Sequence, residues 1–242
     1  MNKMLAASAL AMAASGAFAQ EIAQSDSDWF TAGQDRVQAE LAKQPNTNAA
    51  KNVILFVADG QGVATNYMIR LWSGQQEGGY GDEYVQPQEA FPHLALVKTY
   101  NINAQTPDSA PTAGAMNTGV KQRFNLINLG EDAIHGDCAT EADNRLTLFS
   151  ELMSEAGKSV GAVSTARLTH ATPAAVYAKT ANRNWEYEVP ADCAGSKDIA
   201  TQMIDAMEAG TLDVALGGGA RGFAPADVAT PNGGTGPPGR SP

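Results

Sequence analysis

Three short runs of apolar and β-branched residues stand out in the hydropathy pattern of this chain. They lie at residues 53–58 (VILFVA), 159–165 (SVGAVST) and 212–216 (LDVAL). The first run is continuously apolar, which is typical of a strand that is buried on both faces of a sheet. The pattern therefore predicts three strands.

Segments with helical spacing precede the first run and lie between the successive runs. They lie at residues 29–41, 146–155 and 198–209. Because strands and helices alternate, we predict an α/β fold with a parallel sheet. Ligands of such folds collect at the carboxyl ends of the strands. Asp59 and the residues after Thr165 are expected at those ends.

The first 19 residues have the pattern of a secretory signal peptide. A short basic start containing Lys3 precedes apolar residues 4–18, and the letters AFA at 17–19 match a cleavage site. Residues 20–50 then read as a polar N-terminal arm. The tail at residues 231–242 is rich in Gly and Pro, and we expect it to be irregular. The chain is therefore expected to be periplasmic or secreted.

Charge and cysteine content restrict the partners. The net charge of the 242 residues is −10, which argues against nucleic acid and anionic membrane as partners. Cys138 and Cys193 are an even count in a chain expected to be exported, so a disulfide is the default. Zinc binding by these cysteines is disfavoured, because only His135 lies near either of them at ligand spacing.

Ser109 is a candidate nucleophile within the run TPDSAPTAGA at residues 106–115. It follows an acid and opens a small-residue stretch that can begin a helix. Unpaired N–H groups at a helix N-terminus favour an anion, which suits phosphate-ester chemistry. By itself, however, the run favours the simpler interpretation that Ser109 only caps a helix with Pro111 in its first turn, because caps are commoner than nucleophiles.

Three further motifs are ambiguous when they are taken separately. Asp59 opens the sequence DGQG after the first predicted strand, and is either a helix cap or a carboxylate that binds a metal. In THATP at residues 169–173, Thr172 is a candidate cap and His170 a loop histidine. Arg183 in NRNW suits bidentate binding of phosphate, although a surface arginine is the simpler interpretation.

The order of these motifs resembles that of the alkaline phosphatases. The resemblance extends from about residue 51 to residue 223. Its motifs are a strand followed by DG at 59–60, PDSA at 107–110, NTGVK at 117–121, HATP at 170–173, NRNW at 182–185 and LGGG at 216–219.

The resemblance implies a three-layer α/β/α sandwich with a mostly parallel central sheet. It also implies hydrolysis of phosphate monoesters through a phosphoserine intermediate on Ser109. Arg183 would bind two phosphate oxygens, and Asp108 would orient Arg183. A helix that rises 1.5 Å per residue and runs unbroken from Pro173 would carry Arg183 too far from Pro173 for the two ends to share one small site. We therefore predict that this helix ends near Thr180 and that the chain turns back.

The same resemblance implies two Zn²⁺ ions and one Mg²⁺ ion as cofactors. Asp59 would bridge one zinc and the magnesium, and Thr172 would be a magnesium ligand. Family members carry aspartate or histidine at the position of His170, which leaves the identity of the third metal open. A homodimer is also left open.

The resemblance further implies that residues 51–230 are the N-terminal part of one catalytic domain, truncated before the C-terminal metal ligands. An inactive or partly folded fragment is therefore an alternative. A sulfatase would need arginine at the position of Ala113, which disfavours that alternative.

Overall fold

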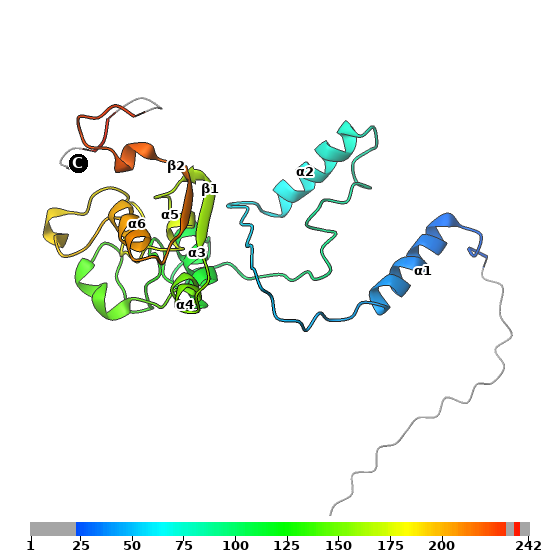
Figure 1. Cartoon of the computed structure of the whole chain (residues 1–242). Helices are drawn as coiled ribbons and strands as arrows, with labels where there is room; N and C mark the ends of the chain where they lie inside the picture. Colours follow the sequence, from blue (N-terminus) through cyan, green and yellow to red (C-terminus); the bar gives the residue numbers. More distant parts are fainter. Residues whose placement is uncertain (1–22, 231–234, 238–242) are drawn as a thin grey trace, which may run out of the picture. The chain divides into compact units, whose positions relative to one another are not determined.

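A computed structural model describes residues 23–230 and 235–237 (Figure 1). The predicted signal peptide and most of the predicted irregular tail lie outside these residues. The chain divides into two compact units. The first contains the described residues up to Leu55 together with residues 90–93, and the second contains the remaining described residues.

Most helices form where the sequence predicts them, with shifts at their ends, but the helix at residues 63–76 is not among the predicted segments. Within the described residues they are α1 (Asp28–Leu41), α2 (Val63–Gln76), α3 (Ser109–Thr118), α4 (Phe149–Glu155), α5 (Ala171–Ala174) and α6 (Ile199–Glu208), with short 3₁₀ turns η1 (Cys138–Thr140), η2 (Ala142–Asn144), η3 (Ala191–Cys193) and η4 (Ala220–Phe223). The helices expected at 29–41, 146–155 and 198–209 correspond to α1, α4 and α6. In the part of the chain that the structure describes, none of them has the length and apolarity needed to cross a bilayer.

Two strands pair in parallel, as the alternation of strands and helices predicts. They are β1 (Gly161–Arg167) and β2 (Val214–Gly218), and Gly161 lies opposite Val214. Each strand begins two residues later than its apolar pattern suggests. Helices α5 and α6 lie between them in the sequence. The prediction of an α/β fold with a parallel sheet is therefore confirmed.

The strand expected at residues 53–58 is absent, and that prediction is wrong. These residues pair with no strand among the described residues, and the side chain of Phe56 is 87% exposed. A continuous apolar run indicates a need for burial, but a strand forms only where another strand satisfies its backbone groups. Asp59 therefore follows an extended segment and does not lie at the end of a strand.

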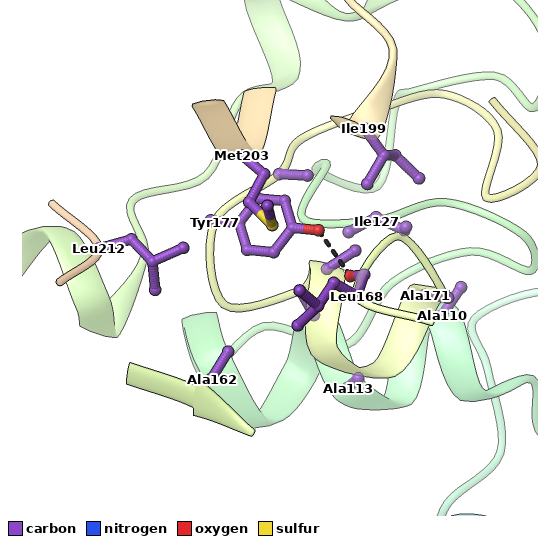
Figure 2. Close-up of a cluster of buried hydrophobic side chains, with 13 residues drawn as sticks. Ala110, Ala113, Ile127, Ala162, Leu168, Ala171, Tyr177, Ile199, Met203 and Leu212 are labelled. Atoms are coloured by element: carbon purple, nitrogen blue, oxygen red, sulfur yellow. Dashed lines mark hydrogen bonds between the residues drawn. The ribbon is translucent and has the colours of Figure 1, made fainter. Parts of the chain in front are cut away.

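The main core of the second unit joins α3, α5, α6 and the sheet (Figure 2). Tyr177 lies inside it, and its hydroxyl donates a hydrogen bond of 2.6 Å to the carbonyl oxygen of Leu168. Burial raises the pKa of this phenol, so the hydroxyl stays protonated and remains a donor. Small residues such as Ala110 and Ala171 allow α3 and α5 to approach closely. This packing brings the N-termini of both helices into one region.

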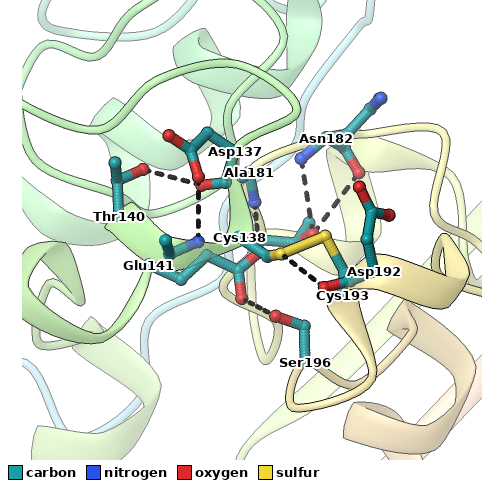
Figure 3. The surroundings of a disulfide bond; sticks show 11 residues. Asp137, Cys138, Thr140, Glu141, Ala181, Asn182, Asp192, Cys193 and Ser196 are labelled. Atoms are coloured by element: carbon teal, nitrogen blue, oxygen red, sulfur yellow. Dashed lines mark hydrogen bonds between the residues drawn. A yellow bond between two sulfur atoms is a disulfide. The ribbon is translucent and has the colours of Figure 1, made fainter.

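A disulfide between Cys138 and Cys193 is present, as predicted, with 5.7 Å between the two Cα atoms. It links η1 to η3, and Glu141 lies beside it (Figure 3). The buried carboxylate of Glu141 accepts hydrogen bonds from the backbone N–H of Ala181 and from the hydroxyl of Ser196, both at 2.7 Å. The disulfide and Glu141 together hold the segment that leads to Arg183.

Candidate active site

Ser109 is the first residue of α3, and Asp108 is the residue that caps this helix. The Asp108 carboxylate accepts a hydrogen bond of 3.3 Å from the backbone N–H of Ala110. The alternative in which Ser109 is only a helix cap is therefore wrong, because Asp108 takes that part. The hydroxyl of Ser109 is left available for other contacts at the positive end of the helix.

Arg183 reaches the N-terminus of α3 from a loop. Its Nη1 forms an ion pair with Oδ1 of Asp108 and donates a hydrogen bond of 3.0 Å to Oγ of Ser109. The Asp108 side chain is 5% exposed and that of Arg183 is 19% exposed. Helix α5 ends at Ala174, six residues before the end predicted near Thr180, so that predicted boundary is wrong. The chain nevertheless turns back before Arg183, as predicted. The structure therefore places the predicted nucleophile, cation and orienting acid in direct contact.

His170 lies on the other side of the same guanidinium group. Its Nε2 is 3.1 Å from Nη2 of Arg183. Burial, together with the positive charge of Arg183, lowers the pKa of this imidazole. His170 is therefore neutral at pH 7, which is the form that binds metals.

Asp59 and Thr172 form a second contact between predicted site residues. The hydroxyl of Thr172 donates a hydrogen bond of 2.7 Å to Oδ2 of Asp59. Neither residue is a helix cap: α5 begins at Ala171 with His170 as its N-cap, and Gly62 precedes α2. The prediction of Thr172 as a cap is wrong, because the helix begins one residue before it. Both oxygen-bearing side chains are left free of a capping role.

The residues of the site fit magnesium better than zinc. A carboxylate and a hydroxyl in contact are hard oxygen ligands of the kind that Mg²⁺ accepts. Zinc sites take three or four His, Cys or acidic ligands. Within residues 23–230 and 235–237, no three such side chains are grouped in that way. The described residues therefore do not complete a zinc site.

Three residues that support the site were not identified from the sequence as site residues. Asn101 accepts a hydrogen bond of 2.9 Å from the backbone N–H of Asp108. Glu186 and Asn125 also contact segments that carry the site, as described below. The only signal for Asn125 is its residue type, because asparagine tolerates the left-handed conformation better than most residues. For Asn101 and Glu186, no local sequence pattern indicates a part in the site.

Glu186 holds the segment before His170 in place. Its carboxylate accepts hydrogen bonds from Nε and Nη2 of Arg167, at 2.8 and 2.7 Å, and from the hydroxyl of Thr169 at 2.6 Å. Burial opposes the ionisation of Glu186, but these hydrogen bonds outweigh it and lower its pKa. The carboxylate is therefore ionised in the folded protein.

Glu186→Gln is expected to lower the free energy of unfolding by about 1–2 kcal/mol at pH 7. The pKa of Glu186 is lower in the folded than in the unfolded chain, so its contribution is complete above pH 4.5 and declines as the pH falls through the folded-state value. Urea unfolding at pH 7 and at pH 3.5 would measure this. An equal difference between variant and wild type at both pH values would contradict the expectation.

A model of the alkaline phosphatase family matches residues 50–241. The chain therefore belongs to the alkaline phosphatase family. It is 41% identical over 196 residues to the tissue-nonspecific alkaline phosphatase of Gallus gallus, which covers 79% of this chain and 37% of the relative. An alkaline phosphatase of Gadus morhua is 40% identical over 196 residues, covering 79% of this chain and 41% of that protein.

A solved structure agrees with this assignment. The cold-active alkaline phosphatase of a psychrophilic Shewanella species is 27% identical, with a TM-score of 0.53, over 69% of this chain and 36% of that one. The chain spans about two fifths of the length of the curated relatives it matches.

Proposed function

We propose that the protein hydrolyses phosphate monoesters through a phosphoserine intermediate on Ser109. The observation that carries the proposal is the contact of Arg183 with both Asp108 and the Ser109 hydroxyl at the start of α3. In this contact a candidate nucleophile, a cation held by an ion pair and a helix N-terminus lie together, which supports the proposal. Such an arrangement suits an anionic phosphate group better than a neutral substrate.

The reaction would proceed in two displacements at phosphorus. Oγ of Ser109 attacks the phosphate, forming a new P–O bond while the ester P–O bond breaks and the alcohol leaves. Water then attacks the phosphoserine, the bond between phosphorus and Oγ of Ser109 breaks, and inorganic phosphate leaves. Over the two steps the serine proton passes to the leaving alcohol, and a proton from water restores the hydroxyl of Ser109. Arg183 binds oxygens of the transferring group and stabilises their charge in both steps. Asp108 keeps the guanidinium in the required orientation.

We further propose a metal requirement of two Zn²⁺ ions and one Mg²⁺ ion. Bound metals would lower the pKa of the serine hydroxyl and of water, and would stabilise the leaving oxygen. Asp59 would contribute to one zinc site and to the magnesium site, and Thr172 would be a magnesium ligand. His170 would lie at the same third metal position. Because the described residues do not complete a zinc site, the alternative is a fragment that lacks activity by itself.

Export to the periplasm or the exterior is the proposed location. The signal-peptide pattern at residues 1–19 supports it, and so does the disulfide, which persists in oxidising compartments. The substrates would be small phosphate monoesters. A homodimer stays a prediction.

Trapping the covalent intermediate tests the proposed function. The protein, supplied with Zn²⁺ and Mg²⁺, is incubated with p-nitrophenyl phosphate and quenched with acid, and its peptides are analysed by mass spectrometry. We expect release of p-nitrophenol and one phosphate on the peptide that contains Ser109. Ser109→Ala should show neither. Turnover without phosphorylation of Ser109 would exclude the proposed intermediate, and no turnover with all three metals would favour the inactive fragment.

A further inference from the structure

Asn125 contacts both members of the ion pair in the candidate site. Its backbone N–H donates a hydrogen bond of 2.9 Å to Oδ2 of Asp108. Its carbonyl oxygen accepts a hydrogen bond of 3.0 Å from the backbone N–H of Arg183. A single residue therefore connects the acid and the arginine through its main chain.

The conformation of Asn125 makes this double contact possible. Its φ angle is 67°, in the left-handed region of backbone conformation that residues with a Cβ atom rarely adopt. Glycine adopts this region without strain, and asparagine tolerates it better than alanine or a β-branched residue. A residue that prefers right-handed or extended angles would turn the N–H and the carbonyl away from their present partners.

The flanking chain fixes the position of Asn125. Phe124 donates its backbone N–H to Oδ1 of Asn103 at 2.8 Å, and the side chain of Leu126 is fully buried. Ile127 exchanges two backbone hydrogen bonds with Thr180, at 3.1 and 3.0 Å, on the segment that leads to Arg183. The two segments are therefore held together, and the φ angle of Asn125 decides where its polar groups point.

We propose that Asn125 is a positioning residue for the phosphate-binding arginine. The inference rests on the proposed function, because it assumes that Arg183 binds the phosphate group. Asn125 touches no substrate in this arrangement and acts only through Asp108 and Arg183. The left-handed backbone of Asn125 donates its N–H to the Asp108 carboxylate and accepts the backbone N–H of Arg183 on its carbonyl oxygen. Both contacts restrict the guanidinium of Arg183 to one orientation, in which it faces Ser109.

Substitutions at this position separate backbone conformation from side-chain chemistry. Asn125→Gly removes the side chain but keeps access to the left-handed region, whereas Asn125→Val opposes that region. Binding of inorganic phosphate, with Zn²⁺ and Mg²⁺ present, is measured by calorimetry. We expect Asn125→Gly to stay within about twofold of wild type, and Asn125→Val to bind about tenfold more weakly, the size of one lost charge-assisted hydrogen bond.

A spectroscopic measurement reports the arginine without requiring any activity. In protein with ¹⁵N-labelled arginine, a guanidinium held in an ion pair rotates slowly and gives separate Nη signals; Arg183→Lys identifies those of Arg183. We expect wild type and Asn125→Gly to show them, and Asn125→Val to lose them. If wild type binds no phosphate, the proposed function fails, while the arginine spectra still decide the part of Asn125.

Gly157→Ala is the matched control. Gly157 has a φ of +71° beyond the end of α4, with no atom within 4 Å of an added Cβ, so alanine there introduces comparable backbone strain away from the site. It should lower the melting temperature but leave phosphate binding and the Arg183 signals unchanged. Equal loss in Asn125→Gly and Asn125→Val, or in Gly157→Ala and Asn125→Val, would overturn the proposal, and so would wild-type behaviour of Asn125→Val.

Discussion

Replacing Arg183 with alanine is expected to lower kcat/KM for a phosphate monoester by about 10²–10³-fold. The substitution removes the cation that contacts both Ser109 and Asp108. It also leaves the Asp108 carboxylate, only 5% exposed, without its charged partner, so the free energy of unfolding should fall by about 3 kcal/mol. Steady-state kinetics and urea unfolding, both with Zn²⁺ and Mg²⁺ present, measure the two effects.

Arg123→Ala provides the control for this prediction. Arg123 donates a hydrogen bond of 3.0 Å to the backbone carbonyl of Glu131, and no hydrogen bond or ion pair found among the described residues joins it to Ser109 or Asp108. Its loss should change kcat/KM by less than about twofold and stability by about 1 kcal/mol at most. If Arg183→Ala retained wild-type kinetics, Arg183 would not bind the transferring phosphate, and its part would be limited to the ion pair with Asp108.

Removing the disulfide is the second change with a large expected effect. Cys138 and Cys193 are 55 residues apart, so the bond restricts a long loop in the unfolded chain. Replacing both cysteines with serine should lower the free energy of unfolding by about 4 kcal/mol. For a chain of this length, the melting temperature should fall by about 8–16 °C. Calorimetry of the oxidised wild type and the double variant would measure both.

Reduction of the wild type serves as a check, because dithiothreitol breaks the same bond without changing any residue. Reduced wild type and the serine variant should melt at similar temperatures. A loss below about 1 kcal/mol would mean that the unfolded chain is already compact in this region, so the bond restricts little. A larger loss in the variant than on reduction would indicate that packing of the sulfur atoms contributes separately.

The candidate site divides into residues that a local motif identifies and residues that only a distant contact identifies. Ser109, Asp108 and Arg183 lie in short motifs whose order along the chain predicts a common site, and the structure brings them into contact. Asn125 and Glu186 lie in no such motif. Asn125 acts through its backbone, and a left-handed φ angle leaves only a weak preference in residue type.

The capping residues show the limit of local interpretation. The sequence places a helix start near Ser109 and another near Thr172, and both helices form there. However, the caps are Asp108 and His170, one and two residues earlier than expected. Several neighbouring residues can accept a hydrogen bond from a helix N-terminus, and tertiary contacts decide among them. Here, the choice leaves the two hydroxyl groups available.

The sequence by itself determined the α/β class, the presence of a parallel sheet, the disulfide and the order of the candidate site residues. These follow from hydropathy period, cysteine count and motif order, all of which can be taken from the sequence without knowing how the chain folds. Only the tertiary structure decided that residues 53–58 remain exposed and that Asn125 connects Asp108 to Arg183. Strand pairing and ion-pair geometry depend on partners far away in the sequence, which a local pattern cannot specify.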